Sequence, residues 1–247
     1  MFTQSRRIVA GGLAVMVAGA GVAIAGPTGA ELNDAKVVSK VTPTKLSKKK
    51  FTPVKSLLGV VNSPDSAGNP TGNAKSERIA ISKNIKVKLS KAPVCTAALP
   101  NGSTPQFAKD ACPKKSYLGG GKATVHAPGP VLAAEPVVSV FNGPNPGQLR
   151  LHTYSDDLGA ASPVVNAFIV KANQQERNKG YGQALDVPNA PVTGALKITS
   201  FKATVKKSSK VVTARCKPKK LKVQRTVTYT DDSSETATKS QKCKVKK

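Results

Sequence analysis

The chain is poor in the side chains that most often carry nucleic-acid recognition and acid–base chemistry. Its 247 residues include no tryptophan, 4 % aromatic residues, two histidines and only seven arginines. Proteins that bind single strands stack the bases on aromatic rings, and proteins that read duplex sequence use the planar fork of arginine. The composition therefore argues against specific nucleic-acid recognition.

Recognisable catalytic motifs are missing as well. The sequence has no G-x-S-x-G turn, which many serine hydrolases use to expose their nucleophile. Gly119-Gly120-Gly121-Lys122 lacks the spacing of a phosphate-binding loop, and Ala123 stands where such a loop needs serine or threonine. We interpret this glycine run as a flexible lead-in to a strand. The prediction is a protein that is not an enzyme, with no cofactor and no metal site.

Residues 1–25 have the pattern of an export signal. Arg6 and Arg7 precede an uncharged run over 8–25, which ends in the small-x-small pattern Ala23-Ile24-Ala25 that signal peptidase cleaves. An uncleaved membrane anchor needs about 20 apolar residues, whereas this run has 18 and contains four glycines. The arginine pair also resembles the twin-arginine motif, so the export route stays open, as does retention of the segment as an anchor. We expect a secreted protein, either extracellular or held in the cell envelope.

Positive charge dominates the rest of the chain. The formal net charge of the full sequence is +26, and loss of Arg6 and Arg7 with the signal lowers it to +24. Such a charge attracts polyanions, and we expect anionic cell-wall polymers or an anionic membrane surface as partners. A solvated surface that only keeps the protein dispersed is the simpler interpretation and stays open. The predicted polyanion-binding residues are Lys206, Lys207, Lys210, Lys217, Lys219, Lys220 and Lys222.

Four cysteines follow the signal, and they can pair in three ways. We predict the pairing of sequence neighbours, Cys95 with Cys112 and Cys216 with Cys243, because an exported chain meets an oxidising environment. A zinc site built from the four thiolates needs closely spaced pairs such as C-x2-C, and neither pair has that spacing. Each disulfide is expected to stabilise the fold by about 3 kcal/mol.

Short apolar runs separated by Gly, Pro, Asn and Asp predict an all-β fold. We expect an antiparallel β-sandwich of about ten strands, with a signal peptide over 1–25, a flexible basic leader over 26–44 and a single domain over 45–247. Alternating apolar residues between Ile79 and Leu89 predict one half-buried strand. No sustained helical stripe of apolar residues appears outside the signal.

Two further features predict local details of this sheet. The apolar phase shifts between Ile198 and Phe201, which predicts a β-bulge at Thr199-Ser200. The last two apolar runs, 221–230 and 235–244, predict a terminal hairpin. The acidic cluster between them, Asp231-Asp232-Ser233-Ser234-Glu235, could bind calcium, but a hairpin turn needs small polar residues at this place anyway.

The alternative function is a secreted hydrolase. Its candidate catalytic residues are His152, Tyr154, Asp156 and Asp157. Strand alternation places His152 and Tyr154 on one face with Arg150, so a histidine base close to carboxylates is conceivable. A histidine in this setting is more often a structural residue that hydrogen-bonds its neighbours. A deep pocket around His152 would favour the hydrolase.

Several short motifs follow one another in a fixed order between about 45 and 244. They are Leu46-Ser47-Lys48-Lys49-Lys50-Phe51-Thr52-Pro53-Val54, Val94-Cys95, Ala111-Cys112-Pro113-Lys114-Lys115-Ser116, Gly119 to Ala123, Phe141-Asn142-Gly143, Leu151-His152, Tyr181-Gly182, Ala214-Arg215-Cys216, Thr228-Tyr229-Thr230-Asp231 and Gln241-Lys242-Cys243. Their order resembles a group of uncharacterised secreted β-rich proteins of high-GC Gram-positive bacteria with two cysteine pairs. The resemblance implies a secreted β-rich domain with paired cysteines, without implying an activity.

Overall fold

The computed structural model describes residues 36–62, 74–126, 133–159, 162–188, 197–217 and 220–246. The expected signal peptide, residues 26–35 of the expected leader, and Lys219 lie outside these ranges. No helix within them is both long and apolar enough to span a membrane.

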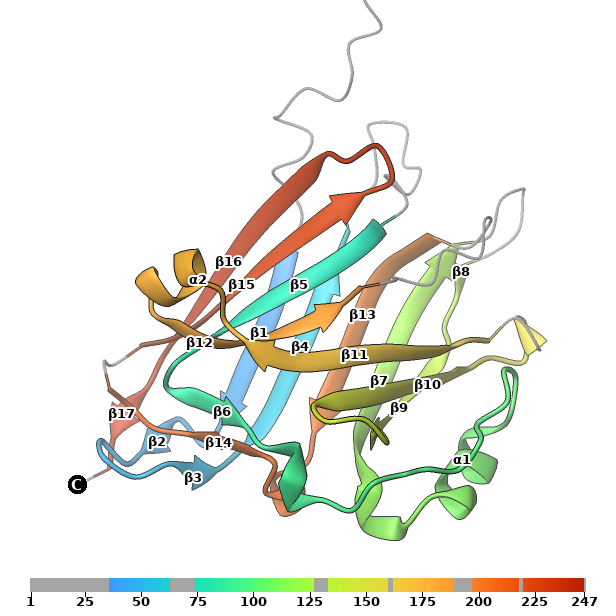
Figure 1. Ribbon diagram of the computed structural model, residues 1–247, viewed down its shortest axis with the longest axis horizontal. Helices are drawn as coiled ribbons and strands as arrows, with labels where there is room; N and C mark the ends of the chain where they lie inside the picture. The colour runs from blue at the N-terminus through green and yellow to red at the C-terminus, as the bar shows by residue number, and fades with distance from the viewer. Residues whose placement is uncertain are drawn as a thin grey trace, which may run out of the picture.

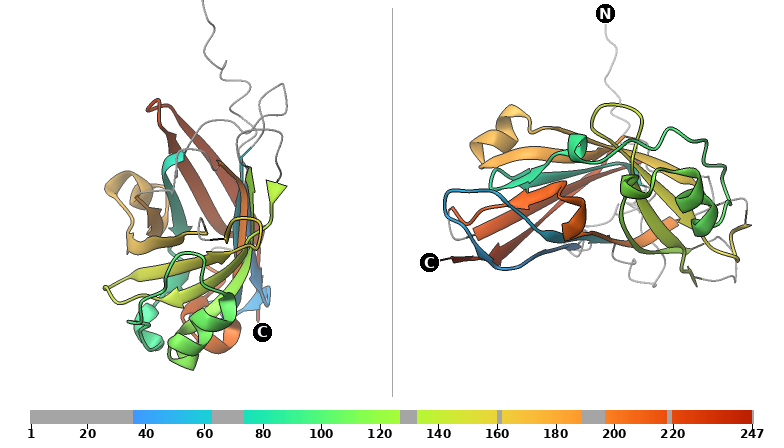
Figure 2. Two further views of the ribbon diagram at one scale, coloured as in Figure 1. Left: turned by 90° about the vertical axis from the view of Figure 1, so that its right-hand side faces the viewer. Right: turned by 90° about the horizontal axis from the view of Figure 1, so that it is seen from below.

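A single twelve-stranded antiparallel sheet forms the body of the protein, and it curls so far that its two edge strands lie side by side (Figures 1 and 2). In sheet order the strands are β1 (Lys36–Thr42), β4 (Lys55–Val61), β13 (Lys197–Val205), β7 (Tyr117–His126), β9 (Val137–Asn142), β10 (Gln148–Tyr154), β11 (Val164–Lys171), β12 (Tyr181–Val187), β5 (Ala74–Ser82), β15 (Lys220–Tyr229) and β16 (Ser234–Lys242), with β8 (Ala133–Ala134) paired to β7. The left view of Figure 2 shows β5 and β12 opposite β1, β4 and β13. The structure confirms the all-β antiparallel prediction, and the two layers are opposite halves of one continuous sheet.

A side chain joins the two edge strands. The Gln241 amide of β16 accepts a hydrogen bond from the Val41 backbone N–H of β1 at 2.7 Å and donates one to the Val41 carbonyl at 2.8 Å. These two bonds imitate one step of a strand ladder. The seam between β1 and β16 therefore depends on a glutamine amide at this point.

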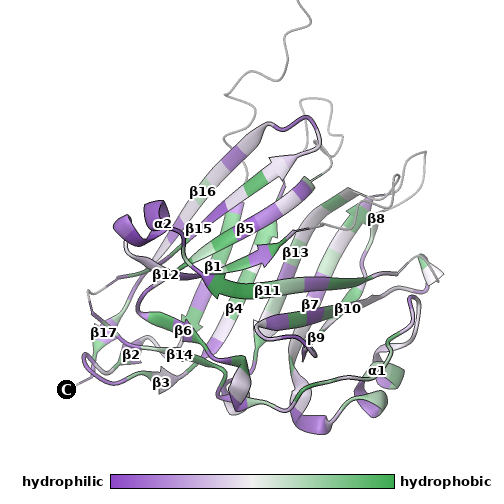
Figure 3. Cartoon of the chain, viewed as in Figure 1, coloured by the Kyte–Doolittle hydropathy of each residue, from purple (hydrophilic) through white to green (hydrophobic). Residues whose placement is uncertain are grey.

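Alternating apolar residues turn inward from both halves of the sheet and form the main core. In β15 every second residue is buried, from Leu221 to Tyr229, and Val37 and Val41 of β1 are buried in the same way. Figure 3 shows this alternation as green and purple bands along the strands. Burying side chains of this size stabilises the fold by about 1.5–3 kcal/mol each.

The expected flexible leader is wrong for residues 36–44. Lys36–Thr42 forms the edge strand β1 and pairs with β4 along its whole length. Lys45–Leu46 follows as β2, which pairs with the terminal strand β17 (Lys244–Val245) in parallel. Lys36 and Lys40 of β1 are exposed, whereas Val37 and Val41 are buried in the core.

The single strand expected between Ile79 and Leu89 is two strands. A turn at Lys83 and Asn84 ends β5, and the chain continues as β6 (Ile85–Val87) and a short 3-10 helix, η2 (Leu89–Lys91). Apolar residues on both sides of the turn face the core, so the alternation survives the break. Strand β6 joins β14 (Val212–Ala214) and β3 (Thr52–Pro53) in a separate three-stranded sheet.

The local predictions at the C-terminal half are confirmed. The pairing of β13 with β7 shifts register between Ile198 and Ser200, which is the expected bulge. Strands β15 and β16 form the expected hairpin. In its turn, Asp231 accepts hydrogen bonds from the backbone N–H and hydroxyl of Ser233 at 3.0 and 2.6 Å, so the acidic cluster shapes the turn.

The glycine run 119–121 lies inside β7 and is not a flexible lead-in. A Cβ on Gly121 would lie 1.7 Å from the Lys202 carbonyl oxygen, and one on Gly119 would lie 1.9 Å from that of Thr204. These glycines therefore permit a close approach of β7 to β13.

Helical segments also occur that the sequence pattern did not reveal. They are α1 (Pro105–Ala111), α2 (Gln174–Asn178) and the 3-10 turns η3 (Lys114–Ser116) and η5 (Lys207–Ser209). Thr104 caps α1 and Pro105 occupies its first position, whereas Asn173 and Glu176 form a reciprocal capping box on α2.

Both expected disulfides are present. Cys95 is bonded to Cys112 with Cα atoms 5.0 Å apart, and Cys216 is bonded to Cys243 with Cα atoms 5.8 Å apart. The first ties the segment that carries α1 to a small satellite core around Phe141. The second ties β14 to the C-terminal segment beside β2. Disulfides of this kind are typical of oxidising compartments outside the cytoplasm.

Candidate basic binding end

One end of the molecule gathers cations from four separate stretches of the chain. These stretches, 43–54, 83–95, 206–217 and 243–246, contribute fifteen lysine and arginine residues and no aspartate or glutamate. We call this region the basic end. It lies along the lower edge of Figure 1, around β2, β17, β3, β14 and β6.

Backbone hydrogen bonds hold the four stretches of the basic end together. Cys216 donates to the Ser47 carbonyl at 2.9 Å, Val54 to Val212 at 3.0 Å, and Lys88 to Val211 at 2.8 Å. The Cys216–Cys243 disulfide adds a covalent tie. The charged side chains thus project into water from a fixed backbone.

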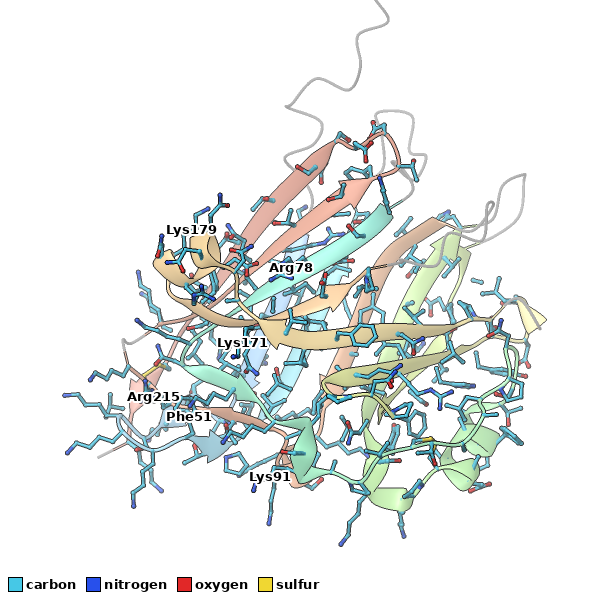
Figure 4. The ribbon with its side chains drawn as sticks, viewed as in Figure 1. Phe51, Arg78, Lys91, Lys171, Lys179 and Arg215 are labelled. Atoms are coloured by element: carbon cyan, nitrogen blue, oxygen red, sulfur yellow. A yellow bond between two sulfur atoms is a disulfide. The ribbon has the colours of Figure 1, made fainter. Side chains whose placement is uncertain are left out.

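Two cations of the basic end stack on the ring of Phe51. The Lys86 Nζ is 4.4 Å and the Arg215 guanidinium carbon 4.7 Å from the ring centroid. The Arg215 Nε donates to the Asn84 side-chain oxygen at 3.1 Å, which fixes the guanidinium beside the ring. Figure 4 shows Phe51, Arg215 and Lys91 along this edge. The aromatic ring holds two positive charges close together.

A hollow of about 260 Å³ lies between β6 and β12, and Lys86, which stacks on Phe51, is one of its lining residues. Lys83, Lys86 and Lys88 line it. Gln183 of β12 also lines it and fixes β6, because its amide accepts from the Val87 N–H at 2.8 Å and donates to the Val87 carbonyl at 3.0 Å. The three lysines among its lining residues belong to the positive charge of the basic end.

No carboxylate within the described ranges forms an ion pair with any of these fifteen cations. The ion pairs of those ranges lie elsewhere and join Lys75 to Asp232, Arg78 to Glu176 and Asp186, Lys122 to Glu135, and Arg225 to Glu77. The positive charge of the basic end is therefore not neutralised within the described protein.

The predicted polyanion-binding lysines fall into two groups. Lys206, Lys207, Lys210 and Lys217 are exposed at the basic end. Lys220 and Lys222 lie on β15, where the Lys222 Nζ stacks 4.7 Å from the Tyr181 ring centroid and donates to the Lys179 carbonyl.

The prediction omitted the lysines of the two N-terminal stretches. Those are Lys45, Lys48, Lys49, Lys50, Lys83, Lys86, Lys88 and Lys91. The Lys48-Lys49-Lys50 run was their most visible signal in the sequence. Only the folded sheet brings these residues beside the C-terminal ones.

The structure does not gather the candidate catalytic residues. His152 is fully buried and faces the 95–112 segment, where its Nε2 lies 3.0 Å from the Ser103 hydroxyl. The Ser103 hydroxyl donates to the Pro100 carbonyl at 2.7 Å, so the histidine is the donor to serine and does not activate it. The His152 Nδ1 is buried without a hydrogen-bond partner in the described ranges. Burial lowers the pKa of His152, and the backbone of Ser103 opposes that shift only in part.

The other three candidates form exposed local contacts. The Tyr154 hydroxyl donates to Asp156 at 2.5 Å, and the Ser155 hydroxyl lies 3.4 Å from Asp157. His152 lines neither the hollow between β6 and β12 nor the cavity inside the sheet, which Leu151 and Thr153 line from the opposite face of β10. Within the described ranges, no group of three or more His, Cys, Asp or Glu residues could hold a metal ion.

The chain matches no protein-family model and no curated protein. Among solved structures it is similar to the N-terminal domain of the Streptococcus gordonii adhesin Sgo0707, with 11 % sequence identity and a TM-score of 0.32. The match covers 86 % of this chain and 33 % of that chain, so this chain spans about a third of the length of that structure. A likeness this weak carries no argument about function.

Proposed function

We propose that this protein is an exported, non-enzymatic binding module of the cell envelope that holds anionic polymers at its basic end. One observation carries the proposal: fifteen cations without a single carboxylate, on one rigid end of the fold. The two disulfides support an oxidising location outside the cytoplasm.

The distribution of the cations favours a polymer over a small anion. An exposed charge pair contributes only about 0.2–1 kcal/mol, so strong binding needs many pairs at once. Fourteen of the fifteen cations are lysines, which are hydrated point charges and lack the geometric selectivity of arginine. We therefore expect binding that depends on the charge density of the polymer and weakly on its chemical pattern.

Retention on isolated cell wall, measured as a function of ionic strength, tests the proposal. The test variant changes Lys48, Lys49, Lys50 and Lys86 to glutamine. The matched control removes the same charge from exposed lysines of other surfaces, Lys36, Lys171, Lys202 and Lys239. The test variant should lose about tenfold in affinity, as expected for four screened contacts, while the control loses much less.

Two results would refute the proposal. Retention that persists at high ionic strength would exclude an electrostatic mechanism, because surface charges are screened over about 8 Å at physiological salt. Equal losses in the test variant and the control would show that only net charge matters, and the basic end would then have no special role.

A further inference from the structure

The N-terminal disulfide closes a loop over residues 96–111, which carries α1 and packs against β9 and β10 (Figure 1). The buried loop residues Leu99 and Ala108 join Phe141 of β9 in the satellite core. Val140, the preceding residue of β9, belongs to the main core, so the two cores lie on opposite faces of the sheet. The loop can therefore lift from the sheet while the main core stays closed.

Two basic side chains of β10 hold this loop. The Arg150 Nη1 donates a hydrogen bond to the Ala97 carbonyl at 2.6 Å. Two residues further along the same face of the strand, the His152 Nε2 lies 3.0 Å from the Ser103 hydroxyl. Because that hydroxyl donates to the Pro100 carbonyl at 2.7 Å, it accepts from the histidine. His152 therefore holds the loop through a proton on Nε2.

His152 fits this place only in its neutral form. Its side chain is completely buried, and its Nδ1, the atom that would take a second proton, has no hydrogen-bond partner in the described ranges. A buried N–H without an acceptor and a buried charge both destabilise the closed structure. Burial lowers the pKa of His152, a backbone hydrogen bond with Ser103 offsets this in part, and the positive charge of Arg150 lowers the pKa further.

The surrounding elements supply no carboxylate that balances a proton on His152. Its neighbours in the sheet, Ser139 of β9 and Val164 of β11, do not titrate. The titratable or charged groups on β10 and its following turn, on β7 beside the satellite core and on α1 are Arg150, Tyr154, Asp156, Asp157, Tyr117, Lys109 and Asp110. The three aspartates among them are exposed, and no ion pair in the described ranges reaches His152.

We propose that His152 is a pH-sensitive latch, which holds the 96–111 loop on β10 at neutral pH and releases it in acid. Protonation places a second cation beside Arg150 in a site without water, and the imidazolium becomes hydrated only when the loop lifts. The Cys95–Cys112 bond keeps the two ends of the released loop together. Release exposes the satellite core around Phe141. This latch does not depend on the proposed function.

The lowered pKa gives the direction of the response. The stabilisation by neutral His152 is present above the pKa of an exposed histidine, about 6.5, and is lost as the pH falls through the folded-state pKa. Between these two values one proton is taken up on opening, so each pH unit lowers the closing equilibrium about tenfold.

Hydrogen exchange of the full chain, corrected for the intrinsic pH dependence of exchange, tests the proposal. The Gly102 N–H, which donates to the Ser162 carbonyl, and the Ala108 N–H, which donates to that of Thr104, report on the loop. Below about pH 6.5 their protection should fall by up to about tenfold per pH unit, while the amides of β15 in the main core keep theirs.

Two variants separate the histidine from other groups. His152→Gln keeps an N–H donor for Ser103 and cannot be protonated, so protection of the loop should no longer depend on pH. His126→Gln changes the other histidine of the chain, at the end of β7, and should behave like the wild-type protein. If His152→Gln does not fold, NMR titration of the wild-type imidazole replaces it, because His152 should become protonated in step with the loss of protection.

Four results would overturn the proposal. Protection of the loop could stay constant between about pH 7 and about pH 5. Its loss could persist in His152→Gln, which would assign the effect to carboxylates. The amides of β15 could lose protection together with the loop, which would indicate global unfolding. Finally, His152 could become protonated without any loss of protection in the loop.

Discussion

The basic end and a buried glutamate row place charged groups in opposite environments of one fold. In the row, Glu77 of β5 and Glu235 of β16 both pair with Val227 of β15. At the basic end, fifteen cations share a surface without carboxylates, and all but Arg215 are exposed to water. In the interior, Glu77, Glu235 and Arg225 are removed from water, and each contacts a named partner. At the surface, water and salt screen each charge, so that a single interaction is weak. Inside the protein the charges are not screened, and each buried charged group needs a partner of its own.

The difference predicts opposite responses to substitution and to salt. Loss of one surface lysine removes one screened interaction, and the rest of the basic end is unaffected. Loss of one interior partner leaves a buried charge or hydrogen-bond acceptor without any partner, protein or water, and this lowers the stability of the folded state. Binding at the basic end should therefore weaken steadily with ionic strength, while the interior row should hardly respond to salt.

The largest effect is expected for Arg225→Met. The substitution leaves Glu77 buried without its cation and also removes the donors to Val61 and Asn62. Breaking a buried ion pair in this way lowers the free energy of unfolding by about 3–5 kcal/mol. Chemical denaturation of the variant and the wild-type protein measures the loss.

Two further variants check the cause of that loss. Adding Glu77→Gln to Arg225→Met removes the uncompensated charge and should recover part of the stability. Lys122→Met breaks the exposed pair with Glu135 and should cost no more than about 1 kcal/mol. A loss in Lys122→Met as large as that in Arg225→Met would contradict the contrast between interior and surface.

The two disulfides should separate stability from binding. Replacing Cys216 and Cys243 by serine, or Cys95 and Cys112 by serine, should each cost about 3 kcal/mol in the free energy of unfolding. The Cys216–Cys243 disulfide joins two stretches of the basic end to each other, 206–217 and 243–246, whereas the Cys95–Cys112 disulfide joins the stretch 83–95 to a residue outside that end.

Retention on isolated cell wall, at a temperature where both variants are folded, distinguishes them. It should fall for the Cys216/Cys243 variant and stay near wild type for the Cys95/Cys112 variant. Equal retention by both variants would show that the disulfide does not organise the basic end.

The features that the sequence predicted correctly are set by nearby residues. The hairpin of β15 and β16 needs one turn, the bulge at Thr199-Ser200 needs one phase shift, and the cysteine pairs are sequence neighbours. The short helices escaped detection because seven and five residues are too few to show an apolar stripe. Their caps, Thr104-Pro105 and Asn173 with Glu176, were the only available signal.

Features that depend on remote parts of the chain were not predictable in this way. Glu77 and Arg225 are 148 residues apart, and nothing local marks either as buried. Strand β1 was predicted to belong to a flexible leader because the stretch from 26 to about 50 is polar and basic and ends in Lys48-Lys49-Lys50. The basic end needs the pairing of β2 with β17 and of β6 with β14 before its four stretches meet.

A third carboxylate, Glu176, should make a small contribution to the pH dependence of stability, opposite in sign to that of Glu77 and Glu235. Glu176 accepts two hydrogen bonds from Arg78 at 2.8 and 3.0 Å and caps α2, and the Arg78 contact holds the pKa of Glu176 below its usual value. A lowered pKa means that this stabilisation is present above the pKa of the unfolded chain and is lost as the pH falls through the folded-state pKa. Glu77 and Glu235 act in the reverse sense, because their pKa values are raised and their burial costs stability as the pH rises.

Glu176→Gln isolates this contribution. The variant should lose about 1–2 kcal/mol at neutral pH, from the cap and the partly buried ion pair together. Its melting temperature should approach that of the wild-type protein in acid, where Glu176 is protonated in both states. A difference that stays constant from neutral pH to acid would mean that the charge of Glu176 is not what stabilises the helix.

The smallest effect is expected for Phe51→Leu at the basic end. Leucine keeps an apolar side chain of moderate size but removes the ring that holds the Lys86 ammonium and the Arg215 guanidinium at 4.4 and 4.7 Å. Each contact of this kind contributes about 0.5–1 kcal/mol at an exposed site. Without the ring the two cations can separate, so affinity for isolated cell wall at low ionic strength should fall about threefold. Phe107→Leu changes an exposed phenylalanine of α1, where no cation stacks among the described residues, and should leave affinity unchanged. If both substitutions have the same effect, Phe51 supplies only apolar contact, and the spacing of the cations around it does not contribute to binding.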